Sequence, residues 1–158
     1  MWTGPDSGLS VGRLTSAVVV ELIDQAVLDV LLVGFAVQTE PSVAAALKRA
    51  RQRDVVVTLL VQRPADNPRF TGPGTPFPGL DAVRLHWPAD ERLAGASLHA
   101  KVLVIDGRSA LIGSANLTGA ALGRNLECGL LVHGGPVPAD IRTHVRRLLH
   151  LGVLHDLR

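Results

Sequence analysis

The residues of this 158-residue chain best suited to chemistry are clustered between positions 98 and 128. His99 and Lys101 lie two positions apart, so on a strand both side chains project from one face. There an imidazole can attack phosphorus while an ammonium holds a non-bridging oxygen. Ser114 and Asn116 follow in a Gly/Ser/Asn-rich loop and can donate, with loop N–H groups, to phosphate charge. A nucleophile beside a cation and several hydrogen-bond donors is suited to a reaction at a phosphate group.

A tight turn must bring this loop back to the His99 face. Asp106-Gly107 is predicted to be a two-residue hairpin turn between two short strands. The turn is itself a sufficient reason for an Asp at this position. Gly113 is expected to supply backbone freedom where the loop begins. We therefore assign Asp106 and Gly113 structural roles rather than contact with substrate.

The first predicted elements have the order of an α/β domain. Helical spacing of apolar residues spans 14–27 and 39–50, and apolar runs of strand length span 29–37 and 54–61. A strand, a helix and a strand in this order imply a parallel pair with a right-handed crossover. We expect a mixed, largely parallel sheet flanked by helices.

The rest of the chain continues the sheet after an irregular segment. Residues 62–80 hold five prolines and three glycines and are predicted to be a loop. Further strands are expected at 82–86, 98–105, 109–112 and 127–132, and a last amphipathic helix begins at Pro138 and buries Ile141, Val145, Leu148 and Leu149. We expect one domain over 1–158, with the short segment before residue 14 indicating a fragment of a longer protein.

Composition narrows the class of protein. Hydrophobic residues make up 47% of the chain and charged residues 19%, a globular balance. The single Cys128 forms no intrachain disulfide, which favours a cytoplasmic protein, and no apolar run is long enough for a membrane anchor. The remaining histidines, at 86, 133, 144, 150 and 155, lack metal-ligand spacing, so we expect no metal and no cofactor.

Charge is less informative about the partner. The formal net charge of +2 is too small to identify a nucleic-acid binder. Two basic clusters are present: Lys48, Arg49, Arg51 and Arg53, and Arg142, Arg146 and Arg147. Each is interpreted either as a solvated helix end favoured by the helix dipole or as a surface that follows phosphates.

The motif residues resemble the phospholipase D superfamily. Its pattern is His, any residue, Lys, four residues, Asp, six residues and Gly-Ser-any-Asn. The matching positions are His99, Lys101, Asp106, Gly113, Ser114 and Asn116. The resemblance implies catalysis through a phosphohistidine, and it adds Glu127 as an acidic residue that accepts a hydrogen bond from the His99 ring.

Family members use two such motifs, and this chain has one. The resemblance therefore implies a homodimer in which two copies share the site. The small size of the chain, the lack of a membrane element and the basic clusters favour a nuclease acting on nucleic acid. A nucleophile and a phosphate clamp made of side chains, without a carboxylate cluster for two metal ions, favour a metal-independent reaction. The alternatives are a phospholipase or small phosphodiester hydrolase, with an apolar entrance at Phe70 and Phe77, and a non-catalytic phosphate-binding component of a phage-defence complex.

A second, narrower resemblance concerns the start of the chain. Trp2-Thr3-Gly4-Pro5, followed by Arg13 and Thr15, is similar to the phospholipase D-like component of DISARM-type phage-defence systems. It implies a role in phage defence.

Overall fold

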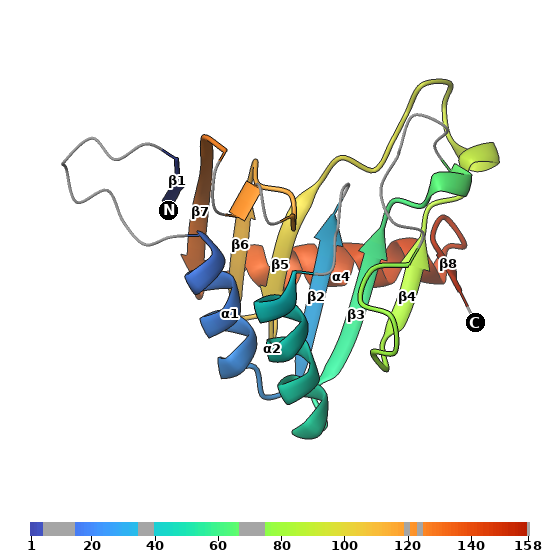
Figure 1. The fold of residues 1–158 in the computed structure, drawn as a ribbon. Coiled ribbons are helices and arrows are strands. Elements are labelled where there is room, and N and C mark those ends of the chain that lie inside the picture. Colours follow the sequence, from blue (N-terminus) through green and yellow to red (C-terminus); the bar gives the residue numbers. More distant parts are fainter. Residues whose placement is uncertain (5–14, 35–39, 67–74, 119–120, 123–124, 158) are drawn as a thin grey trace.

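One mixed sheet forms the centre of the fold. The computed structural model describes residues 1–4, 15–34, 40–66, 75–118, 121–122 and 125–157 (Figure 1). The strands are β1 (Trp2–Thr3), β2 (Asp29–Gly34), β3 (Val56–Val61), β4 (Val83–His86), β5 (Lys101–Ile105), β6 (Ser109–Gly113), β7 (Glu127–His133) and β8 (His155–Asp156). They lie in the order β1-β7-β6-β5-β2-β3-β4-β8.

Helices cover both faces of this sheet. They are α1 (Thr15–Gln25), α2 (Pro41–Gln52) and α4 (Val137–His150), with short 3-10 turns η1 (Pro64–Asp66) and η2 (Ala89–Glu91). In Figure 1, α1 and α2 lie on the near face and α4 crosses the far face. Among the described residues, no helix is both long and apolar enough to cross a membrane.

The strand directions confirm the expected α/β class and correct one detail. β2 pairs in parallel with β3, with α2 as the crossover between them, and β3 pairs in parallel with β4. Antiparallel pairs join β2 to β5, β5 to β6 and β6 to β7. Parallel pairing is therefore a smaller share of the described sheet than expected, because short connections such as the β5–β6 turn can only join antiparallel strands.

The near-continuous apolar runs are strands buried on both faces. In β2, Val30 and Leu32 belong to the core under α1 and α2, whereas Leu31 and Val33 belong to the core under α4. Alternation of side chains across a strand produces this division. In α4, Val145 is buried in the second core and Ile141 packs against it, as the helical spacing predicted.

The start of α2 shows why the chain becomes helical there. Glu40 is the N-cap, and its carboxylate accepts the Val43 N–H at 2.8 Å. Pro41 follows at the first helical turn, where a missing N–H costs nothing. Burial acts to raise the pKa of Glu40, but the hydrogen bonds that its carboxylate accepts from Ser42 and Val43 together outweigh burial and hold the pKa below its usual value.

The hairpin turn lies where it was predicted and is one residue longer. Asp106 and Gly107 have positive φ angles of 55° and 62°, and the Arg108 N–H donates to the Ile105 carbonyl at 2.9 Å. Ile105 is paired with Ser109, so three residues rather than two separate the paired positions. The extra residue is Arg108.

Two short edge strands are additions to the predicted fold. β1 pairs with β7, placing Thr3 opposite Glu127, and β8 pairs with β4, placing His155 opposite His86. Each has only two residues, too few for a period-2 pattern to show in the sequence.

Candidate active site

The motif residues other than Asp106 lie at one edge of the sheet. Lys101, at the start of β5, lies opposite Gly34, at the end of β2. Gly113, at the end of β6, lies opposite Gly129, near the start of β7. We call this side, where β2 and β3 end, the carboxyl edge. Ligands of open α/β sheets bind outside the carboxyl ends of the parallel strands.

His99 and Lys101 are in direct contact. The Lys101 Nζ lies 3.1 Å from Nδ1 and 3.2 Å from Nε2 of the His99 ring, and it donates to the His99 carbonyl at 2.7 Å. His99 is exposed and immediately precedes β5, while Lys101 is half-buried as its first residue. The ammonium and the imidazole therefore lie next to each other at the carboxyl edge.

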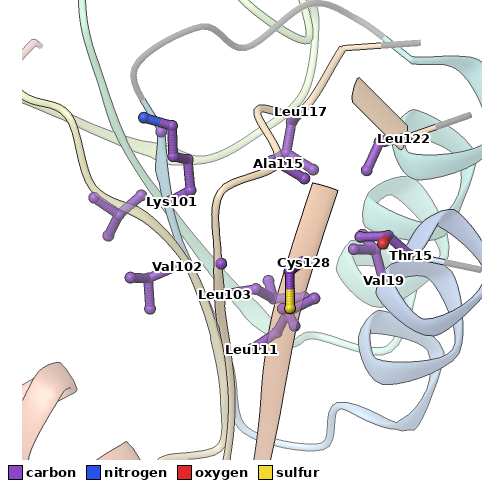
Figure 2. A pocket seen from close by; sticks show the side chains of 14 residues that line it. Thr15, Val19, Lys101, Val102, Leu103, Leu111, Ala115, Leu117, Leu122 and Cys128 are labelled. Carbon is purple, nitrogen blue, oxygen red and sulfur yellow. The ribbon is translucent and has the colours of Figure 1, made fainter. Parts of the chain in front are cut away.

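The surroundings of Lys101 favour proton release. Burial lowers the pKa of its ammonium, and the negative charge of Glu127 acts in the opposite direction. Lys101 lies at one side of a small, mainly apolar cavity of about 40 Å³, whose walls include Val19, Leu111, Leu117 and Leu122 (Figure 2). Partial burial removes water from the charge, which accounts for the direction of the shift.

Glu127 is bound to the Gly-Ser-any-Asn loop. The Ser114 hydroxyl donates to one carboxylate oxygen of Glu127, and Asn125 Nδ2 donates to the other at 3.3 Å. The Ser114 N–H also donates to the Cys128 carbonyl at 3.1 Å. Glu127 thus holds Ser114 and acts electrostatically on Lys101. Its expected hydrogen bond with the His99 ring stays a prediction.

Asn116 lies two residues further along the same loop. It is half-buried, and its backbone carbonyl accepts the Thr118 N–H at 2.9 Å. Ala121 and Leu122 are helical, and Leu122 N–H donates to the Thr118 carbonyl at 2.9 Å. This short turn fixes the far end of the loop that carries Ser114 and Asn116.

Gly113 has a different structural role from the one expected. It ends β6 and is not among the described glycines with positive φ. A Cβ at this position would lie 2.8 Å from the Cys128 carbonyl oxygen and 3.1 Å from Gly129 Cα. Gly113 therefore permits β6 and β7 to approach closely just before Ser114, rather than supplying a left-handed turn.

Asp106 lies at the other end of the strands. Its carboxylate accepts the backbone N–H groups of Leu28 at 2.7 Å, Asp29 at 2.9 Å and Val27 at 3.1 Å. These residues connect α1 to β2, on the side that we call the amino edge. Asp106 thus ties the β5–β6 turn to the start of the neighbouring strand, far from Lys101.

The described contacts of both basic clusters are structural. Arg142 and Arg146 contact the Asp29 carboxylate at 2.9 and 3.0 Å, at the amino edge. Arg49 pairs with Asp24 at 2.7 Å, and Arg51 pairs with Asp81. Since Asp29 begins β2 and Lys101 lies opposite the end of β2, Arg142 and Arg146 are remote from the candidate site.

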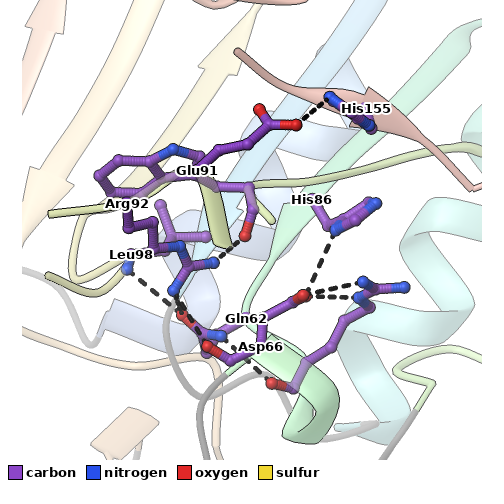
Figure 3. A network of polar contacts seen from close by, with 9 residues as sticks. Gln62, Asp66, His86, Glu91, Arg92, Leu98 and His155 are labelled. Atoms are coloured by element: carbon purple, nitrogen blue, oxygen red, sulfur yellow. Dashed lines mark hydrogen bonds and ion pairs between the residues drawn. The ribbon is translucent and has the colours of Figure 1, made fainter. Parts of the chain in front are cut away.

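Gln62 and Arg92 are site neighbours that sequence reasoning missed. Gln62 Oε1 accepts the Leu98 N–H at 3.3 Å and Arg92 Nη1 at 3.1 Å (Figure 3). A polar residue directly after the buried run 54–61 was the available signal in the sequence. In the described part of the chain, no three His, Cys, Asp or Glu side chains are grouped as metal ligands.

Comparisons with known proteins agree with this geometry. Residues 19–149 match the family described as cardiolipin synthase, PLD-like domain. Nuc from Salmonella typhimurium, a phospholipase D family member, is 20% identical over 90% of each chain with a TM-score of 0.70. NucT from Helicobacter pylori is 17% identical, over 85% of this chain and 86% of its own, with a TM-score of 0.65.

A longer protein shares the same fold. Phosphatidylserine synthase from Haemophilus influenzae is 15% identical and has a TM-score of 0.70, over 94% of this chain but 38% of its own. No curated protein matches the sequence. The family match spans most of the chain and includes all six motif positions. The chain therefore belongs to the PLD-like domain family.

Proposed function

We propose that this chain is a metal-independent phosphodiesterase, and most specifically a nuclease, that works through a phosphohistidine. The observation that carries the proposal is the Lys101 ammonium within 3.2 Å of both ring nitrogens of the exposed His99. A cation beside an accessible imidazole can draw a phosphodiester anion into line with the ring. The chain belongs to the PLD-like domain family, and this membership supports a phosphodiesterase activity.

The proposed reaction has two displacements at phosphorus. A neutral His99 nitrogen attacks, a phosphorus–nitrogen bond forms, and the bond to the leaving oxygen breaks as that oxygen takes a proton from a second, protonated His99. That second imidazole then removes a proton from water, whose oxygen displaces the first His99 and gives a phosphomonoester. Lys101, Ser114 and Asn116 stabilise the charge on the non-bridging oxygens.

The second His99 is proposed to come from another copy of the chain. The sequence contains a single His-any-Lys element. His99 is exposed, and Leu126 and Leu130, each 65% exposed, flank the β7 segment that carries Glu127. Exposed apolar side chains beside a polar site are typical of a surface that another protein covers. A two-fold dimer would bring two identical sites face to face.

A nucleic-acid substrate is favoured over a lipid. This chain matches 90% of Nuc and 86% of NucT, but only 38% of phosphatidylserine synthase. The apolar entrance considered for a lipid substrate loses one of its two aromatic residues: Phe77 is buried in the core under α1 and α2. Phe70 lies outside the described residues. A role in phage defence stays a proposal.

A substrate panel tests the function. Supercoiled plasmid, linear duplex, single strands and a phosphatidylcholine dispersion are each incubated with wild-type protein, with and without EDTA. We expect cleavage of nucleic acid that EDTA leaves intact, and loss of cleavage in His99→Asn and Lys101→Met. His144→Asn, at an exposed position on α4, is the matched control. Activity that EDTA abolishes and Mg²⁺ restores would refute the phosphohistidine assignment.

A further inference from the structure

Gln62 lies at the carboxyl edge, one residue after β3. Its backbone N–H donates to the Gly34 carbonyl at 3.2 Å, which continues the β2–β3 pairing by one more bond. The residue is only 2% exposed. The side chain of Gln62 is therefore fixed at its base by the sheet and enclosed by the protein.

Both the oxygen and the nitrogen of the Gln62 amide have hydrogen-bond partners. Nε2 donates to the Arg63 carbonyl at 3.1 Å, while Oε1 accepts from Leu98 N–H at 3.3 Å and from Arg92 Nη1 at 3.1 Å. Both partners of Oε1 are donors, and the partner of Nε2 is a carbonyl. The reverse amide orientation would set donors against donors, so the hydrogen-bond network determines which way this side chain points.

Arg92, which donates to Gln62 Oε1, is itself held by several other contacts. Its guanidinium donates to the Trp87 carbonyl and, at 3.3 Å, to the Asp66 carbonyl, and it lies 4.8 Å from the centre of the Trp87 ring. Arg92 belongs to the connection between β4 and β5 (Figure 3). The connection that leads into the motif is thus anchored to the end of β3 through Gln62.

His99 lies between two anchors. Before it, Leu98 is 9% exposed in the core under α4, and its N–H is held by Gln62. After it, ladder pairing of β5 with β2 begins at Lys101, opposite Gly34. His99 itself precedes the strand. The position of its backbone therefore depends on the Leu98 anchor as well as on the sheet.

We propose that Gln62 is a positioning residue for the reaction, which sets His99 in register with Lys101 by holding the Leu98 N–H. The inference rests on the proposed role of His99 as nucleophile. A misplacement of about 1 Å at a reacting group can cost on the order of 100-fold in rate. Gln62 has no contact with substrate in this scheme and acts only through Leu98 and Arg92.

Substitutions at position 62 separate positioning from folding. Gln62→Met keeps the length and removes both the acceptor and the donor, whereas Gln62→Glu keeps an acceptor for Leu98 and Arg92 and loses the Nε2 donation to the Arg63 carbonyl. We expect Gln62→Met to lower kcat by roughly 10- to 100-fold with KM nearly unchanged. Gln62→Glu should recover much of that loss. If Gln62→Met does not fold, Gln62→Asn, whose acceptor is withdrawn by one methylene, should lower kcat in the same way.

The control variant removes a similar set of contacts elsewhere. The Arg84 guanidinium donates to the carbonyls of Pro76 and Phe77 at 2.8 Å and to that of Leu80 at 3.4 Å. None of these residues belongs to the candidate site. Arg84→Met should destabilise the fold and leave kcat of the folded protein unchanged. Equal kcat losses in Gln62→Met and Arg84→Met, or wild-type kcat in a folded Gln62→Met, would overturn the proposal.

A measurement that needs no enzyme activity tests the positioning role independently of the proposed function. Amide hydrogen exchange of Leu98 is measured by NMR in the same variants. We expect faster exchange in Gln62→Met and exchange close to wild type in Gln62→Glu and Arg84→Met. If wild-type protein cleaves nothing, the proposed function fails while the exchange rates still decide whether Gln62 holds the motif. Unchanged exchange at Leu98 in Gln62→Met would overturn the positioning role regardless of activity.

Discussion

The Asp106 carboxylate accepts the Leu28 N–H at 2.7 Å, joining residues that are 78 positions apart in the sequence. The same carboxylate also accepts the N–H groups of Val27 and Asp29. Asp106 is therefore part of the motif because it ties the β5–β6 hairpin to β2, and β5 is the strand that carries Lys101. The motif therefore combines residues of the candidate site at the carboxyl edge with a structural residue, Asp106, at the amino edge.

The first prediction concerns the hydrogen bonds that the Asp106 carboxylate accepts. Asp106→Ala removes the acceptor of three backbone N–H groups and places Ala at a φ of 55°. We expect the free energy of unfolding to fall by roughly 2 to 4 kcal/mol. Asp106→Asn, which tolerates this φ and keeps one acceptor oxygen, should lose less. Urea unfolding measures both.

Asp81→Ala is the control for this series. Asp81 is 83% exposed and pairs with Arg51 on the surface. Its removal should change the free energy of unfolding by less than about 1 kcal/mol. An Asp106→Ala protein as stable as Asp81→Ala would show that the three N–H contacts contribute little.

The second prediction is that Lys101 contributes to the fall of activity at alkaline pH, in addition to the second, protonated His99 that the proposed mechanism requires as an acid. Burial lowers the pKa of its ammonium, and Glu127 opposes that shift without cancelling it. As pH rises, the ammonium should lose its proton earlier than an ordinary lysine, and the substrate clamp should weaken. Lys101→Arg keeps its charge at every accessible pH. We expect this variant, measured by kcat/KM against pH, to lose the part of the alkaline decline that Lys101 contributes, while the part that comes from the need for a protonated His99 remains. An alkaline limb unchanged in Lys101→Arg would assign it to another group.

The third prediction concerns His86 and the pH dependence of stability. Burial and the charge of Arg63 lower the pKa of His86, with a small further contribution from His155, while the Asp66 carboxylate 3.3 Å away acts in the opposite direction. In the unfolded chain a histidine has a pKa near 6.5. As pH falls through this value, the unfolded state takes up a proton that the folded state resists. Stability should therefore fall on acidification from about pH 7 to pH 5, by at most about 1.4 kcal/mol per pH unit.

Asp66 contributes in a separate window. Burial raises its pKa, but the hydrogen bonds and charge of Arg63 outweigh burial and leave the pKa below normal. Its stabilisation is present above the unfolded pKa of about 4 and is lost only at lower pH. His86→Gln should flatten the stability profile between pH 5 and 7, and exposed His150→Gln should not. Equal flattening in both variants would show that His86 is not responsible.

The sequence predicts best those features that depend on local pattern. The strand at Asp29, the helix α2 and the Asp106-Gly107 turn follow from an apolar run, from helical spacing and from turn residues. The features it could not predict depend on tertiary distance. Gln62 gives no local signal of its bond to Leu98, 36 residues away, and the role of Gly113 depends on the close approach of β7. The basic clusters show the same limit, because Arg142 and Arg146 are adjacent to Asp29 only in the folded chain.

The last prediction tests whether two chains share one site. Each chain contains a single His-any-Lys element, and His99 is exposed at the carboxyl edge. If both His99 residues of a dimer are required, mixing wild-type protein with His99→Asn makes activity fall as the square of the wild-type fraction, because a mixed dimer has only one imidazole. His99→Asn removes part of an exposed ring and opens no apolar cavity, so folding and dimerisation should survive.

The measurement is the initial rate of phosphodiester hydrolysis against the mixing ratio, at constant total protein and after confirmed subunit exchange. In the control series, His144→Asn, exposed on α4, replaces His99→Asn. The initial rate should then be the same at every mixing ratio. A linear decline with His99→Asn, or an active species that light scattering shows to be monomeric, would mean that each chain works alone. A rate that follows the square in the test series and stays flat in the control requires two intact imidazoles in each working site.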